Sequence, residues 1–131
     1  MARVVWLDDQ KEAFRVPSEI LTDRGHQVFG TTSETEALTV LETEGADLFI
    51  QDIDRPGMGG VEFLRAMRNR PGPAAIPVVI FSAYPPPREG LVLPGPRGGM
   101  PMPVQGWIMK LVMIEQLVDE LVRVLREASQ G

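Results

Sequence analysis

Four short apolar runs constrain the fold of this chain more than any other feature, because each favours a strand and each is followed by polar side chains. The runs are VVWL, LFI, VVIF and WIM, and the polar residues after them include Asp8, Asp52, Ser82 and Lys110. Continuous apolar runs of this length are typical of strands buried on both faces of a parallel sheet. The runs therefore predict a parallel sheet with polar side chains at its carboxyl edge.

The segments between these runs carry helical signals. Ser33-Glu34-Thr35-Glu36 has the spacing of a capping box and predicts a helix that ends near Gly45. Residues 61–69 and 114–125 have apolar side chains at helical spacing, and residues 27–30 predict a further strand. The resulting order, βαβαβαβ, loop, β and α, predicts a doubly wound α/β sandwich in one domain of residues 1–131.

Two helices carry local predictions of their own. Pro17 is expected in the first turn of a helix that runs to about Arg24, with Gly25 closing it, because proline is disfavoured in a helix interior. In the last helix, Asp119 and Arg123 are four residues apart and are expected to form an exposed ion pair.

The stretch from residue 84 to 106 departs from the alternation. It holds seven prolines and five glycines in 23 residues, a density that forbids a normal helix. A Pro/Gly-rich loop is therefore predicted where the alternation calls for a helix.

Composition excludes several classes of function. The chain has no cysteine and a single histidine, His26, so Cys-ligated zinc, thiol catalysis and multi-histidine metal sites are excluded. His26 is expected at the surface. The net charge of -5 disfavours a nucleic-acid backbone as the partner. The sequence has neither a signal-peptide layout nor an apolar run approaching the roughly 18 residues of a membrane span, and we expect a cytoplasmic domain.

The polar strand ends predict a chemistry when they are taken together. A single aspartate after a strand is most simply a turn former or a helix cap. If the strands are parallel, however, Asp8, Asp9 and Asp52 share one edge and repel one another unless a cation lies among them. Mg²⁺ prefers such oxygen ligands, and Ser82 and Lys110 are suitable contacts for phosphoryl oxygens. The set predicts phosphoryl transfer to a carboxylate.

This ordered set resembles the receiver domain of two-component response regulators over essentially the whole chain. The acidic pair corresponds to Asp8-Asp9, the phospho-acceptor to Asp52 in DIDRPGMGG, and the hydroxyl and small residue to Ser82-Ala83. The lysine corresponds to Lys110, and the switch aromatic to Trp107. The resemblance implies a flavodoxin-like, CheY-like fold with a five-stranded parallel sheet in a three-layer α/β/α sandwich.

The resemblance also implies a role for each residue. Asp9 and Asp52 would ligate Mg²⁺ directly, Asp8 would act through water, and the backbone carbonyl of Asp54 would complete the protein ligands. The phosphoryl group would be held by Ser82, the Ala83 amide and Lys110. The implied donor is a histidine kinase or a histidine phosphotransfer protein. The implied output is a downstream protein or a homodimer, signalled through residues 84–106, the last strand and the last helix.

Three differences separate the chain from the family pattern. Leu111 follows the lysine where the family has a proline, Asp54 places a carboxylate two residues from the acceptor, and the loop at 84–106 replaces the fourth helix. A phosphorylation-independent pseudo-receiver that binds a protein partner is therefore an alternative. Asp52-Ile53-Asp54 also resembles the motif of haloacid-dehalogenase-like phosphatases, but Asp8-Asp9 precede it, which is the wrong order. We expect a phosphoryl acceptor with self-dephosphorylation, not a turnover enzyme.

Overall fold

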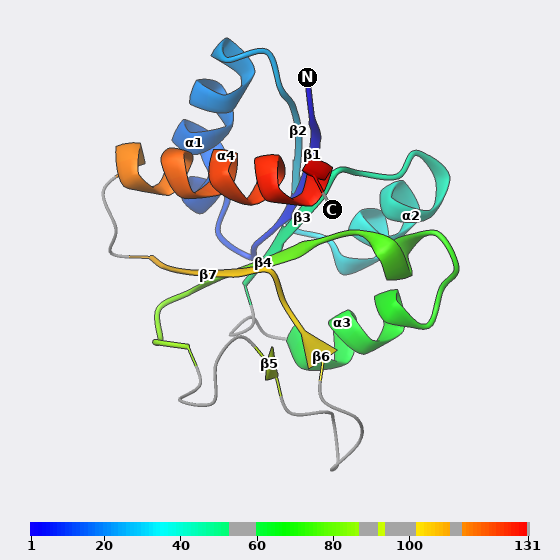
Figure 1. The fold of residues 1–131 in the computed structure, drawn as a ribbon. Helices are drawn as coiled ribbons and strands as arrows, with labels where there is room; N and C mark the ends of the chain where they lie inside the picture. Colours follow the sequence, from blue (N-terminus) through cyan, green and yellow to red (C-terminus); the bar gives the residue numbers. More distant parts are fainter. Residues whose placement is uncertain (53–59, 87–91, 94–101, 111–113, 131) are drawn as a thin grey trace.

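The structure of the protein is a computed structural model that describes residues 1–52, 60–86, 92–93, 102–110 and 114–130 (Figure 1). Its elements in chain order are β1 (Arg3–Leu7), α1 (Lys11–Asp23), β2 (Gln27–Thr31), α2 (Glu34–Thr43), β3 (Leu48–Gln51), α3 (Gly60–Arg68), the 3₁₀ turn η1 (Pro73–Ala75), β4 (Val78–Ser82), β5 (Val92–Leu93), β6 (Met102–Pro103), β7 (Gly106–Met109) and α4 (Ile114–Gln130).

Five strands form one parallel sheet in the order β2-β1-β3-β4-β7. The direction in which successive strands join the sheet reverses at β1. The second strand, β2, lies on one side of β1, and β3, β4 and β7 follow on the other side. The prediction of a doubly wound, five-stranded parallel sheet is confirmed. The two remaining strands, β5 and β6, pair antiparallel as a separate ribbon.

The sheet is covered on both faces, with α1 and α4 on one side and α2 and α3 on the other (Figure 1). Side chains alternate between the two cores along each strand: Val5 and Leu7 join the α2/α3 core, whereas Val4 and Trp6 join the α1/α4 core. All four are fully buried, and each contributes about 1.5–3 kcal/mol by leaving water. Burial on both faces explains why the strands read as continuous apolar runs.

Helix α1 corrects the prediction for Pro17, which lies inside the helix and not in its first turn. Proline lacks the N–H that would bond to the carbonyl of Ala13, so the helix loses one hydrogen bond. Pro17 and Leu21 are the buried residues of α1, and the burial of their apolar side chains offsets that loss. Gly25 has a φ of +91°, the left-handed conformation that ends a helix, as predicted.

Helix α2 begins and ends where the capping box and Gly45 predict. The Ser33 hydroxyl accepts a hydrogen bond from the Glu36 N–H at 3.2 Å, as the capping-box spacing predicts. Gly45, with a φ of +73°, follows the helix.

The predicted ion pair between Asp119 and Arg123 is wrong. The Arg123 guanidinium instead contacts the carboxylates of Glu120 and Glu127, which lie three and four residues away on the same face of α4. Asp119 points to α1, where its Oδ1 lies 3.9 Å from Arg24 Nη1. The tertiary contact between the two helices thus decides the partner of Asp119.

The region from 84 to 106 is described only in part. Residues 84–86, the strands β5 and β6, and residues 104–106 contain no helix. The other residues of the predicted loop lie outside the described part, so replacement of the whole helix stays a prediction. Val104 is buried in the core that contains α3, and the Gln105 N–H and side-chain oxygen both bond to the backbone of Val78, at 2.7 and 2.6 Å. Among the described helices, none is long and apolar enough to cross a membrane.

Candidate functional site

The carboxyl edge of the sheet gathers the polar residues that follow the strands. Asp8 follows β1, Asp52 follows β3, Ser82 ends β4 and Lys110 follows β7. The parallel register places Leu7 opposite Gln51 and Ser82 opposite Met109, so these strand ends are level with one another. Residues separated by up to 102 positions in the chain thus form one site.

Lys110 joins two carboxylates at the centre of this site. Its Nζ lies 3.0 Å from Asp52 Oδ2 and 3.1 Å from Asp8 Oδ2. Asp8 is fully buried and Asp52 is 3% exposed, whereas the lysine side chain is 25% exposed. A lysine ammonium therefore balances two carboxylates that water reaches poorly.

Burial and ion pairing act in opposite directions on these groups. Burial raises the pKa of the Asp8 carboxyl, and the Gln10 N–H and Lys110 only partly offset this effect. Burial also disfavours the Lys110 ammonium, but its contacts with Asp52 and Asp8 outweigh burial and raise its pKa. The lysine is thus held in its charged form by the acidic site.

The same carboxylates fit a divalent cation. Asp8, Asp9 and Asp52 each offer an oxygen, and these three oxygens all lie within 4.8 Å of one another. Asp9 is the most exposed of the three. Hard carboxylate oxygens suit Mg²⁺, and the exposure of Asp9 is compatible with an ion that keeps part of its water shell. Asp54, the fourth predicted ligand, lies outside the described residues.

Ser82 and Trp107 are connected through the backbone of Tyr84. Ser82 is fully buried, and its Oγ accepts a hydrogen bond from the Tyr84 N–H at 3.1 Å. Trp107, which is half-buried, donates its indole N–H to the Tyr84 carbonyl oxygen at 2.8 Å. Ala83, whose amide is predicted to bind the phosphoryl group, is exposed. One peptide segment therefore contacts both the hydroxyl residue and the aromatic residue.

Among the described residues, Phe81 lies at the site but was not predicted from the sequence. The Lys110 Nζ lies over its ring at 5.7 Å from the centroid. The only available signal was an aromatic residue at the end of a buried strand, which is indistinguishable from ordinary core in the sequence.

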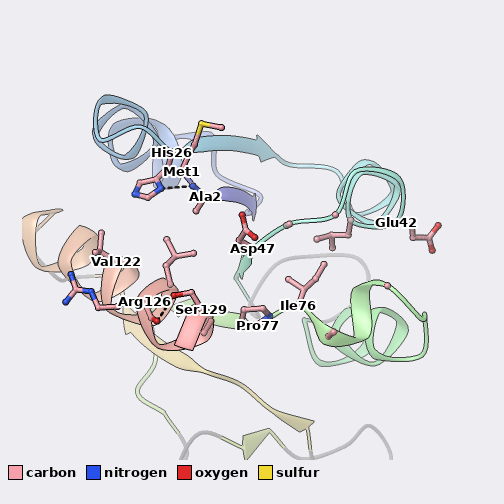
Figure 2. Close-up of a pocket in the computed structure, with 17 residues that line it drawn as sticks. Met1, Ala2, His26, Glu42, Asp47, Ile76, Pro77, Val122, Arg126 and Ser129 are labelled. Atoms are coloured by element: carbon pink, nitrogen blue, oxygen red, sulfur yellow. Dashed lines mark hydrogen bonds between the residues drawn. The ribbon is translucent and has the colours of Figure 1, made fainter. Parts of the chain in front are cut away.

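A cavity of about 760 Å³ lies at the opposite, amino edge of the sheet (Figure 2). It contains none of the predicted site residues. His26, predicted at the surface, is a half-buried lining residue, and its Nδ1 accepts a hydrogen bond from the Ala2 N–H at 3.1 Å. The bond forms because β1 and β2 begin side by side. Figure 2 shows His26 and Arg126 toward one side of the cavity and Glu42 toward the other.

The fold and the carboxyl-edge site together define a class of protein. It is a doubly wound α/β domain in which three carboxylates, a hydroxyl residue and a lysine meet at one edge of a parallel sheet.

Within that class, the chain belongs to the response regulator receiver domain family, whose model matches residues 4–90. The family resemblance is thereby confirmed. The match includes Asp8, Asp9, Asp52 and Ser82. Trp107 and Lys110 lie beyond it, so their place in the site rests on the structure.

Curated relatives agree with this assignment. The chain is 32% identical over 83 residues to the response regulator protein FleR of Pseudomonas aeruginosa, covering 63% of this chain and 17% of that protein. It is 30% identical over 82 residues to sporulation initiation phosphotransferase F of Bacillus subtilis, covering 63% of this chain and 64% of that protein. The chain thus spans less than two thirds of the length of these relatives.

Solved structures share the fold. The chemotaxis response regulator CheY4 of Vibrio cholerae is 26% identical, with a TM-score of 0.77 and coverage of 95% of this chain and 98% of that chain. A CheY-like receiver domain from Methanospirillum hungatei, at 23% identity, has a TM-score of 0.76 over 99% of this chain and 98% of that chain. The CheY-like, flavodoxin-like architecture is confirmed.

Proposed function

We propose that this chain is a phospho-accepting signal receiver in a two-component phosphorelay, and that Asp52 takes the phosphoryl group. The observation that carries the proposal is the position of Lys110, whose ammonium lies within 3.1 Å of both Asp52 and Asp8 in a chain of the receiver family. A cation placed beside a buried carboxylate stabilises the charge that a transferred phosphoryl group brings.

The proposed donor is the phosphohistidine of a histidine kinase or a histidine phosphotransfer protein. An Asp52 carboxylate oxygen attacks the phosphorus in line, the phosphorus–nitrogen bond breaks, and its electron pair stays on the donor imidazole. Bound Mg²⁺ would neutralise charge on the carboxylates and on the phosphoryl oxygens. Asp8, Asp9 and Asp52 are the described residues that would hold it, with the carbonyl of Asp54 as the further proposed ligand.

Lys110 would then contact a phosphoryl oxygen, together with the Ser82 hydroxyl and the Ala83 amide. A shift of Ser82 toward that group would change its hydrogen bond with the Tyr84 N–H, and Tyr84 also holds Trp107. The proposed output is thus a change at Trp107, at β7 and α4, and in residues 84–106, read by a downstream protein or a second copy of the chain. Hydrolysis of the aspartyl phosphate would reset the domain, which we propose acts as a cytoplasmic signalling module and not as a turnover enzyme.

Labelling with acetyl phosphate and Mg²⁺ tests this proposal. The unaltered chain is expected to take up phosphate and to bind beryllofluoride, and Asp52→Asn is expected to do neither. Asp23→Asn is a matched control, because Asp23 is an exposed aspartate at the end of α1. Equal uptake by Asp52→Asn would reject Asp52 as the acceptor.

Absence of uptake and of beryllofluoride binding in the unaltered chain would favour the pseudo-receiver alternative. That alternative draws on Leu111 after the lysine and on the non-helical residues described between 84 and 106. The phosphatase interpretation is not proposed, because the chain belongs to the receiver family.

A further inference from the structure

Phe81 combines three features that core packing alone does not require. It directly precedes Ser82 at the end of β4, it is 5% exposed, and its ring lies under the Lys110 ammonium, 5.7 Å from the centroid. This separation is within the range of an attractive contact between a cation and the negative face of an aromatic ring.

Packing fixes the orientation of the Phe81 ring. Its centroid lies 5.5 Å from that of Trp6, with the two planes at 88°, which is the edge-to-face arrangement that aromatic pairs prefer. Trp6 is fully buried and also lies next to Phe14, at 6.4 Å between ring centroids. The ring is therefore a rigid platform built from the α1/α4 core.

The backbone and the ammonium of Lys110 both contact residues at the end of β4. Its backbone N–H donates to the Ser82 carbonyl oxygen at 2.8 Å, and its ammonium lies over the ring of the preceding residue. The stem between them has four rotatable bonds, and ordering it costs conformational entropy. A leucine follows Lys110 in the sequence, and it does not restrict the backbone of the residue before it as a proline does.

We infer that Phe81 is a positioning residue that holds the Lys110 ammonium at the phosphoryl site. This inference rests on the proposed function. Within the described residues, the ammonium also contacts Asp8 and Asp52, both of which belong to the proposed cation site. The ring is not a metal ligand, so its contact persists when the carboxylate oxygens are engaged. It keeps the ammonium directed at the site where the phosphoryl oxygens arrive.

Fluorinated phenylalanine at position 81 provides a graded test. Successive fluorine atoms withdraw charge from the ring face while changing its volume little. Beryllofluoride binding, measured by calorimetry with Mg²⁺ present, is expected to weaken with each added fluorine. For Phe81→Leu, which removes the ring face altogether, the loss is expected to be about three- to thirty-fold. Affinity for Mg²⁺ alone is expected to change by less than about two-fold, since Phe81 is not a ligand.

Phe49→Leu is the matched control. Phe49 is fully buried on the other face of the sheet and packs against Phe63 at 5.5 Å, so the substitution removes an equivalent core ring. It is expected to lower stability without changing the ratio of beryllofluoride to Mg²⁺ affinity.

The inference is overturned if the fluorinated series and Phe81→Leu bind beryllofluoride as the unaltered chain does. It is equally overturned if Mg²⁺ and beryllofluoride affinities fall in parallel, because that result indicates general distortion. Failure of the unaltered chain to bind beryllofluoride would instead reject the proposed function, so the two failures are distinguishable.

Discussion

The Lys110 ammonium and the Asp52 carboxylate, 58 residues apart in the chain, lie 3.0 Å from each other at the carboxyl edge of the sheet. The same ammonium lies 3.1 Å from Asp8. A single lysine therefore offsets the charge of two carboxylates from two other strands.

Lys110→Ala is expected to destabilise the chain by about 1–3 kcal/mol in the absence of Mg²⁺, because it removes the ammonium that lies beside the buried carboxylates of Asp8 and Asp52. Because the lysine side chain is partly exposed, the expected loss of stability is smaller than the loss for a fully buried ion pair. Urea unfolding with and without Mg²⁺ measures the effect. Mg²⁺ is expected to recover more stability in the variant than in the unaltered chain, and an equal gain in both would contradict this account.

The raised pKa values of Lys110 and Asp8 make stability depend on pH. The Lys110 contribution is complete below about pH 10.5, the unfolded value, and is lost as pH rises through the higher folded pKa. Burial raises the pKa of Asp8 above 3.8, so its favourable contribution exists only at acidic pH and is lost as pH rises through the folded pKa.

Asp8→Asn is therefore expected to raise the thermal midpoint at pH 7 without Mg²⁺, while Lys110 keeps its contact with Asp52. Scanning calorimetry from pH 4 to 11 tests both effects. A lower midpoint for Asp8→Asn at pH 7 would show that the ion pair outweighs the burial of the carboxyl.

Trp107→Phe is expected to cost about 0.5–1.5 kcal/mol, since it removes the hydrogen bond from the indole N–H to Tyr84. It is also expected to abolish the change in tryptophan emission when beryllofluoride binds. The chain has two tryptophans, Trp6 and Trp107, so any emission response that remains in Trp107→Phe comes from Trp6. An unchanged emission response in Trp107→Phe would place the reporter elsewhere.

Gly30→Ala is expected to destabilise the chain by about 1–3 kcal/mol. A Cβ at this position would lie 2.4 Å from Cε1 of Phe14, which packs against the strand backbone. Gly72→Ala is the control, because nothing lies within 4 Å of its Cβ and its φ is -70°. Urea midpoints of the two variants should differ clearly, and similar midpoints would mean that Phe14 moves aside freely.

Local signals in the sequence predicted most of the fold. The apolar runs gave the strands, the capping box at Ser33 gave the start of α2, and Gly25 gave the end of α1. The errors at Pro17 and Asp119 share a cause. In each case, packing between elements outweighed the local preference for helix position or for i,i+4 pairing. The spacing of residues in the sequence does not reveal such packing.

The sequence by itself determined which side chains stand at the strand ends, because a buried parallel strand must be apolar and its polar residues must follow it. Hence Asp8, Asp52, Ser82 and Lys110 were identifiable as one set. Only the tertiary structure decided how they meet. The register of the strands brings the lysine to two carboxylates at once, and the packing of Trp6 turns the Phe81 ring toward its ammonium. Distances between strands depend on sheet order and core packing, which are properties of the whole fold and not of any one segment.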